Sequence, residues 1–251
     1  MRIGTACPVW QEQRYLPLVL EQMVRCPGPK IVLWQDQPLH WLGEGHAPSG
    51  HQSRVKDILA QFPEVEVILM DRAPDDGIYG GFKNLGEMGF ALLKERDADL
   101  VVWQDSDWIF DLDEIDQFYT DLVKSETPIR WAVNARHYWR DFYHTMATGG
   151  ITVAFPVDVG LFDVYTEADI RRTPYMCYHP AYVMPDEEMY LKVHSWGHAP
   201  LFKERGFYEK EWLGKDDSLI KPQPADVLPS PAVVRRLHNW GAIEVLKDFY
   251  A

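Results

Sequence analysis

Two aspartates behind a short apolar run are the first residues whose types and spacing suit a chemical role. Asp105 and Asp107 stand two positions apart, directly after Leu100–Trp103. Alternate side chains of an extended segment point to the same side, so both carboxylates would face one ligand. Such a pair can hold Mg²⁺ or Mn²⁺ while substrate phosphates fill the other coordination sites. The same spacing recurs elsewhere in this acidic chain, so it is the position behind the apolar run that favours this pair.

A second acidic group follows Pro185 and opens a segment whose apolar residues have helical spacing. It consists of Asp186, Glu187 and Glu188. A carboxylate in such a place can take the proton of an attacking hydroxyl. Acids behind a proline are also ordinary at a helix start, and Glu188 could pair with Lys192 one turn later. Both interpretations stay open, as does the choice between the two glutamates.

A basic and aromatic cluster lies in the second half of the chain. Its members are Arg130, Arg136, His137, Tyr138, Trp139 and Arg140. Side chains of these types can stack a sugar, a base or a peptide. The alternative is the edge of an aromatic core, flanked by solvated arginines.

The elements that must position these residues are predicted from apolar patterning. Four short apolar runs indicate strands, at 3–7, 30–34, 65–70 and 100–103, and helical spacing follows each of them, at 16–24, 55–62, 82–95 and 115–122. Alternating strands and helices predict a mostly parallel central sheet with helices on both faces. Ligands bind such sheets at the carboxyl ends of the strands, which is where Asp105 and Asp107 stand.

The second half is less regular. We expect strands at 131–134 and 151–155 joined by a polar, aromatic connection over 136–148, and a helix over 185–196. A last helix is expected to carry Ile243, Leu246 and Phe249. No repeat or linker stands out, so one domain is predicted over 1–251, with a nucleotide-sugar half at 1–110 and an acceptor half at 111–251.

In series, these features resemble the GT-A fold glycosyltransferases, most closely the inverting family 2 type. The resemblance rests on the strand-loop-helix opening, Asp36 behind the second strand, the segment Lys83-Asn84-Leu85-Gly86, and Gln-Asp-Ser-Asp behind the fourth strand. It implies a single α/β GT-A domain that transfers a hexosyl or pentosyl group.

The resemblance also implies roles for individual residues on the donor side. Pro8, Trp10 and Glu12 would line the nucleotide pocket, and Asp36 would contact the base or ribose. Lys83 or Asn84 would lie near the donor, and Gly150 would lie under the sugar, although the pair Gly149-Gly150 could equally be a turn. Gln11-Glu12 and Gln35-Asp36-Gln37 depart from the family pattern, which leaves the nucleotide open.

The resemblance also implies a metal site and an acceptor site. Asp105 would face the ribose and the metal ion, and Asp107 would bind Mn²⁺ or Mg²⁺ on the diphosphate. His238 resembles a late histidine that completes the metal shell, although a lone histidine is more often structural. Glu187 or Glu188 would take the acceptor proton, which gives inversion at the anomeric carbon.

The predicted function is therefore metal-dependent transfer of a sugar from a nucleotide-diphosphate sugar, with a UDP-sugar as first choice, to an acceptor hydroxyl. The alternatives are a DNA-modifying glycosyltransferase of the same fold, a nucleotidyltransferase that makes sugar nucleotides, and a glycan-binding module without catalysis. Acidic residues outnumber basic ones, 38 to 25. The net charge of −13 disfavours nonspecific binding along the phosphates of a nucleic acid, which needs a basic surface. DNA as an acceptor stays open, beside a saccharide or another hydroxyl compound.

The remaining expectations concern location. The N-terminus has no signal-peptide core, and no apolar run approaches the roughly 20 residues that span a bilayer. The three cysteines form no CxxC pair. These features predict a cytoplasmic protein without membrane insertion.

Overall fold

A computed structural model gives the architecture of most of the chain. It describes residues 1–10, 14–35, 51–70, 80–161, 163, 166, 169–195, 199–215 and 221–242. The side chains at 51–53, 80–82, 147, 148, 195 and 200 are outside that description. Every structural statement below refers to the described residues.

The N-terminal part of the sheet is parallel and follows the predicted runs. Strands β1 (Ile3–Val9), β2 (Lys30–Gln35), β3 (Glu66–Met70) and β4 (Leu100–Trp103) lie in the order β3-β2-β1-β4. Each neighbouring pair in this order is parallel. β1 and β4 are almost fully buried, as expected of strands covered on both faces.

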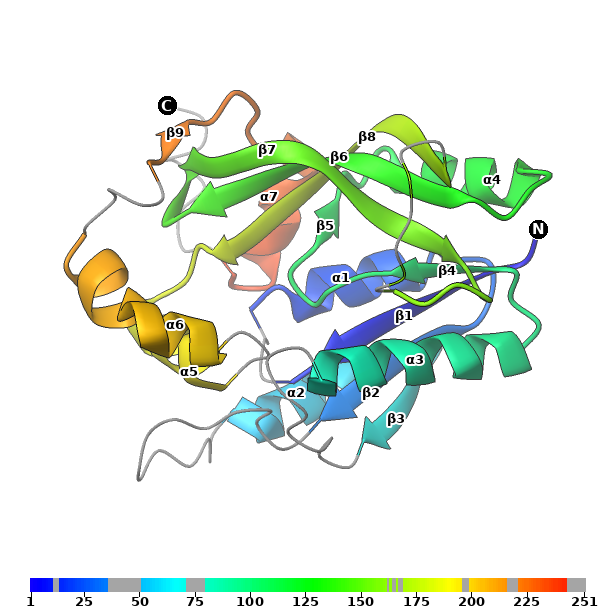
Figure 1. Cartoon of the computed structure of the whole chain (residues 1–251), viewed down its shortest axis with the longest axis horizontal. Coiled ribbons are helices and arrows are strands. Elements are labelled where there is room, and N and C mark those ends of the chain that lie inside the picture. The colour runs from blue at the N-terminus through cyan, green and yellow to red at the C-terminus, as the bar shows by residue number, and fades with distance from the viewer. Residues whose placement is uncertain are drawn as a thin grey trace.

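Helices cover both faces of this parallel part (Figure 1). Cys7 and Val9 of β1 pack against α1 (Leu16–Met23) and α2 (His51–Leu59), whereas Ala6 packs with α3 (Gly80–Glu95) on the other face. Alternate residues of one strand therefore enter two different cores. On α3, a side chain at Gly89 would meet Leu33 at 3.1 Å, so glycine permits the close contact between helix and sheet.

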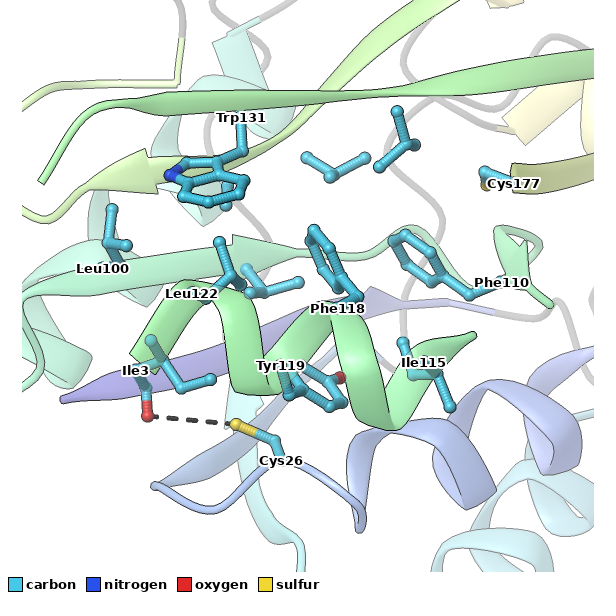
Figure 2. Close-up of a cluster of buried hydrophobic side chains, with 14 residues drawn as sticks. Ile3, Cys26, Leu100, Phe110, Ile115, Phe118, Tyr119, Leu122, Trp131 and Cys177 are labelled. Carbon is cyan, nitrogen blue, oxygen red and sulfur yellow. Dashed lines mark hydrogen bonds between the residues drawn. The ribbon is translucent and has the colours of Figure 1, made fainter. Parts of the chain in front are cut away.

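A third core lies under α4 (Ile115–Lys124). Figure 2 shows Phe118, Tyr119 and Leu122 of this helix lying between the parallel strands and Trp131 of a later strand. The Cys26 thiol contacts the carbonyl oxygen of Ile3 at 3.9 Å at the edge of the same cluster. All three cysteines are buried and free. This core joins the parallel part of the sheet to the part that follows.

The C-terminal part of the sheet is mixed and differs from the predicted connection. Strands β6 (Arg130–Trp139) and β7 (Asp141–Pro156) form a long antiparallel hairpin, and Arg140 between them has a φ of 65°. The prediction of an irregular connection over 136–148 is therefore wrong. Aromatic residues in this stretch favour strands, and one residue in the left-handed region suffices to reverse the chain.

The remaining strands complete one sheet through both halves of the chain. β8 (Ile170–Tyr182) pairs in parallel with β6 and antiparallel with β5 (Ile109–Phe110), and β9 (Gln223–Pro224) pairs with β7. The order is β3-β2-β1-β4-β7-β6-β8-β5, with β9 beside β7. The predicted α/β fold class, a central sheet with helices on both faces, is confirmed, with antiparallel pairs concentrated in the C-terminal part.

Among the described residues, four helical elements follow β8. They are α5 (Asp186–Ser195), α6 (Ala199–Arg205), the π-helical turn η2 (Phe207–Leu213) and α7 (Pro231–Asn239). In α7, Ser230 accepts a hydrogen bond from the Val233 amide and Pro231 occupies the first turn, a common helix start. The predicted last helix at 243–249 lies outside the described residues. In the described part of the chain, no helix has the length and apolar character required to cross a membrane.

Candidate functional site

The loop between β4 and β5 is built as a rigid turn at the carboxyl edge of the parallel strands. The Gln22 side chain of α1 donates to the Phe110 carbonyl at 2.6 Å and accepts from the Phe110 amide at 3.1 Å. It also accepts a hydrogen bond from the Gln104 amide group at 2.9 Å. Both glutamines are fully buried, so these bonds fix the loop to α1 without competition from water.

Within this loop, Asp105 and Asp107 do not form the extended pair that their spacing predicts. The Trp108 amide donates to the Asp105 carbonyl at 2.9 Å, which closes a turn. The Asp105 carboxylate accepts a hydrogen bond from the Trp103 indole at 3.0 Å and is half-buried. Asp107 is buried. The turn therefore gives the two carboxylates different surroundings.

Both oxygens of the Asp107 carboxylate are engaged by side chains from the C-terminal half of the chain. Lys192 Nζ of α5 lies 2.7 Å from Oδ2, and His179 Nε2 of β8 lies 3.3 Å from Oδ1. Burial alone would raise the pKa of Asp107, but Lys192 and then His179 hold this pKa well below its usual range. Asp107 is therefore a carboxylate at neutral pH, matched by a buried ammonium.

A histidine pair extends this network across the sheet. His137 of β6 and His179 of β8 are register partners, and their Nδ1 atoms lie 2.6 Å apart. Burial, and then the neighbouring His179, lowers the pKa of His137 to about 4. One of the two Nδ1 atoms must donate and the other accept, so the rings share a single proton across this contact.

Sequence reasoning missed the network of Lys192, His179 and His137. The pairing of Glu188 with Lys192 is one of the two interpretations that the sequence leaves open; in the structure Lys192 contacts Asp107, and Glu188 contacts Arg14. These three residues come from different elements, and only strand register and helix placement bring them to the Asp107 loop. The one usable signal was the histidine at 137 in the basic and aromatic cluster.

Glu188 is bound by an arginine from the segment behind β1. Arg14 contacts both carboxylate oxygens of Glu188, at 2.7 and 2.9 Å, and also donates to the Ala242 carbonyl at 2.8 Å. Glu187 is exposed, and Asp186 accepts a hydrogen bond from the Trp212 indole at 2.8 Å. The acidic group thus divides into one carboxylate bound by Arg14, one in solvent and one against η2. Figure 1 shows α5 on the side toward which the arrow of β1 points.

The predicted nucleotide pocket is described in part. Pro8 is half-buried in β1, and the Trp10 indole nitrogen is buried without a hydrogen-bond partner among the described residues. Glu12 and Asp36 lie outside the described residues. The residue before Asp36, Gln35, ends β2 with 2% exposure, and its amide nitrogen also lacks a partner in the described part of the chain. Buried donors of this kind point to a ligand or water with acceptor oxygens.

The other predicted donor and metal residues lie on α3, β7 and α7. Lys83 is exposed on α3 and contacts Glu87 at 3.5 Å, beside the half-buried Asn84. Gly150 lies within β7, opposite Asn134, and a side chain there would meet the Arg172 guanidinium at 2.8 Å. His238 is half-buried near the end of α7. These assignments stay predictions.

The basic and aromatic cluster is largely the edge of a core. Tyr138 and Trp139 are buried, and Arg136 forms a bidentate pair with Asp226. Arg140 stacks on Trp139 at 5.3 Å and on Trp212 at 5.5 Å. His137 alone turns into the Asp107 network.

The donor set around Asp107 does not fit a divalent metal ion as it stands. Mn²⁺ and Mg²⁺ favour several oxygen ligands in near-octahedral geometry, whereas both Asp107 oxygens already accept from nitrogen donors. In the described part of the chain, no three His, Cys, Asp or Glu side chains gather in a group that could hold a metal ion. Asp105, Asp107 and His238 are not assembled in that way.

Comparisons with known proteins give structural likeness only. No protein-family model and no curated protein matches the chain. Residues 1–349 of S. aureus TarS are similar in structure, with 12% identity over 87% of this chain and 72% of that chain and a TM-score of 0.39. A cytidylyltransferase from Leptospira borgpetersenii shows 9% identity over 83% and 96%, with a TM-score of 0.41.

A third similar structure contains ligands. It is glucosyl-3-phosphoglycerate synthase from Mycobacterium tuberculosis in complex with Mn²⁺, uridine diphosphate and glucosyl-3-phosphoglycerate. Its identity is 16% over 53% of this chain and 44% of that chain, with a TM-score of 0.35. At such scores none of these likenesses carries an argument about chemistry, which has to come from the residues themselves.

Proposed function

We propose that this chain is a transferase that moves a sugar from a nucleotide-diphosphate sugar to an acceptor hydroxyl, with inversion. The observation that carries the proposal is the seam between the acidic loop behind β4 and the acidic start of α5. The buried ion pair of Asp107 with Lys192 joins this loop to α5, and the half-buried pair of Arg14 with Glu188 joins the segment behind β1 to the same helix. These contacts support a site in which α5 brings a carboxylate to the edge where the parallel strands end.

The donor edge is formed where β1, β2 and β4 end next to one another. Val9 pairs with Trp34, and the backbone amide of Gln104 donates to the Ala6 carbonyl at 3.0 Å. The loops behind these strands therefore lie along one edge of the sheet. The buried nitrogens of Trp10 and Gln35, which have no partner among the described residues, supply donors at this edge. Phosphate and carbonyl oxygens of a nucleotide are acceptors of the matching kind.

Glu188 is the better candidate for the catalytic base. It lies four residues before Lys192, so the two side chains share the face of α5 that meets the Asp107 loop. Arg14 fixes the Glu188 carboxylate beside the segment behind β1. Glu187 is turned about 100° away on the helix and is exposed.

In the proposed step, the acceptor oxygen attacks the anomeric carbon while its proton passes to the Glu188 carboxylate. The bond between the anomeric carbon and the phosphate oxygen breaks, and its electron pair leaves with the nucleoside diphosphate. Attack from the side opposite the leaving group inverts the anomeric configuration. A positioned general base typically contributes about 10²–10⁴-fold to such a rate.

Nucleotidyl transfer is the rival, because a comparable sheet and acidic loop would also serve it. The two reactions differ in the bond that breaks. Sugar transfer releases a nucleoside diphosphate, whereas nucleotidyl transfer from a nucleoside triphosphate releases pyrophosphate. The released phosphate compound therefore separates the two functions without knowledge of the acceptor.

The test begins with thermal shift of the full chain against nucleoside diphosphates, nucleoside triphosphates and nucleotide sugars, with Mn²⁺ or with EDTA. The stabilising nucleotide sugar is then assayed for nucleoside diphosphate release with saccharide and other hydroxyl acceptors. Glu188→Gln is expected to lower turnover about 10²–10⁴-fold. Glu187→Gln is the matched control and should retain activity within about tenfold. Pyrophosphate release, or equal loss in both variants, would contradict the proposal.

A further inference from the structure

The Asp107 carboxylate already binds a cation, and that cation belongs to the chain. Lys192 Nζ lies 2.7 Å from Oδ2, and the side chains of Asp107 and Lys192 are only 6% and 4% exposed. His179 Nε2 takes up the second oxygen at 3.3 Å. A lysine ammonium is a compact point charge, as a metal ion is, although it carries one charge instead of two.

A divalent ion and Lys192 would compete for the same carboxylate. A metal ligated by Oδ2 would have to displace the ammonium, and Lys192 would then be left as a buried charge without Asp107. Removing one partner of a buried pair is strongly unfavourable, because the other charge remains in a poorly solvated place. The ion pair therefore protects Asp107 from metal ions, unlike an acidic pair open to solvent.

We propose that Lys192 occupies the cation position on Asp107, so that Asp107 is not a metal ligand and the site does not depend on a divalent ion there. The fixed ammonium of α5 supplies positive charge beside the diphosphate, and Asp107 and His179 hold it in place. Charge fixed in a poorly solvated site acts more strongly than in water. Lys192 thereby lies one helical turn from Glu188, with the charge for the leaving group and the proton acceptor on one face of α5.

The direct test is Mn²⁺ binding to the full chain without nucleotide, measured from the electron paramagnetic resonance signal of free Mn²⁺. Asp107→Asn should leave the Mn²⁺ affinity of the wild-type chain unchanged. Lys192→Met exposes the carboxylate to metal, so it should gain about tenfold or more in Mn²⁺ affinity, and Asp107→Asn in the same chain should abolish the gain. Lys94→Met is the matched control, because Lys94 is 62% exposed and pairs with Asp158 at the surface.

Two results would overturn the inference. One is a wild-type Mn²⁺ site that Asp107→Asn removes, and the other is a Lys192→Met chain that folds and gains no Mn²⁺ affinity. If Lys192→Met does not fold, the wild-type chain and Asp107→Asn decide by themselves.

A second arm rests on the proposed function and uses the nucleoside diphosphate that stabilises the chain. Its affinity, measured by calorimetry, should be the same within about twofold in EDTA and in Mn²⁺. Lys192→Met should lose affinity in EDTA and regain it in Mn²⁺, because the metal then takes the vacated place. A wild-type affinity that collapses in EDTA would overturn the inference. Failure of every nucleotide to bind would instead overturn the proposed function, while the Mn²⁺ arm still reports on Lys192.

Discussion

The two parts of the sheet are held by different forces. Around β1, β2 and β4, apolar side chains alternate into cores on both faces, and Cys7, Ala6 and Val102 are fully buried. Around β6 and β8, the strands also carry two histidines: His179 contacts Asp107, and His137 contacts His179. The first part is a scaffold that ends in the Asp107 loop, and the C-terminal half supplies His179 and Lys192, which contact Asp107. The candidate site belongs to neither part alone.

The largest expected change in the free energy of unfolding comes from removing the ion pair of Asp107 with Lys192, which joins the two parts. Asp107→Ala leaves Lys192 buried without its carboxylate, and we expect a loss of about 3–5 kcal/mol in the free energy of unfolding, measured in urea. Adding Lys192→Met to the same chain should restore part of that loss, because the buried ammonium that has lost the Asp107 carboxylate is then removed.

The control is the exposed pair of Lys94 and Asp158, in which the side chains are 62% and 72% exposed. Removing it by Lys94→Met should change the free energy of unfolding by about 0–1 kcal/mol. If Asp107→Ala costs no more than this control, the seam is not held by the ion pair.

A comparable effect is expected where the scaffold holds the acidic loop. Gln22→Leu leaves the amide and carbonyl of Phe110 without their side-chain partner, and each unsatisfied buried group costs about 1–3 kcal/mol. Gln117→Leu is the matched control, because that amide contacts only Asp121 on the exposed side of α4. Equal urea midpoints for the two variants would show that the loop does not depend on α1.

Sequence patterning predicted the parallel strands of the N-terminal part better than the strand β8 that carries His179, for a physical reason. β1, β2 and β4 are runs of apolar residues because both faces of the sheet are covered there. β8 carries Arg171, Arg172, Pro174 and Pro180, since part of it is exposed, so no apolar run marks it. Its pairing with β6 also joins segments about forty residues apart, which no local pattern encodes.

The same distinction between local patterns and long-range pairing explains which residues of the candidate site could be predicted. The place of Asp105 and Asp107 follows from a local rule, that the loop behind a central strand opens toward ligand. The partners of Asp107 follow from strand register and from where α5 packs, so neither His179 nor Lys192 could be derived from spacing. The i+4 rule alone would pair Lys192 with Glu188, whereas in the structure Lys192 contacts the buried carboxylate of Asp107.

The pH dependence of stability should reveal the histidine pair. The folded chain holds the pKa of His137 at about 4, below the ordinary value of about 6.5, so the unfolded chain binds more protons between these values. The free energy of unfolding should therefore fall by about 2–3 kcal/mol as pH drops from about 6.5 to 4. The depressed pKa of Asp107 adds a further loss as pH falls below about 3.9.

The measurement is urea unfolding at a series of pH values, together with NMR titration of the His137 ring. In His137→Gln the loss between about pH 6.5 and 4 should shrink, while the loss at lower pH remains. A His137 ring that titrates near its ordinary pKa would show that the pair is open to solvent, and the seam would then be less enclosed than Asp107 and Lys192 indicate.

The smallest expected effect separates two neighbouring glycines of β7. Nothing lies within 4 Å of a side chain built at Gly149, whereas one at Gly150 would meet the flexible end of Arg172 at 2.8 Å. Glycine in a strand is disfavoured by about 0.5–1 kcal/mol relative to alanine, so Gly149→Ala should stabilise the chain by up to that amount. Gly150→Ala should stabilise it less, because Arg172 must move.

If Gly150 also lies under the donor sugar, Gly150→Ala alone should raise the KM for the nucleotide sugar. An unchanged KM in both variants would place the sugar away from β7 and leave the seam at Asp107 as the donor side of the site.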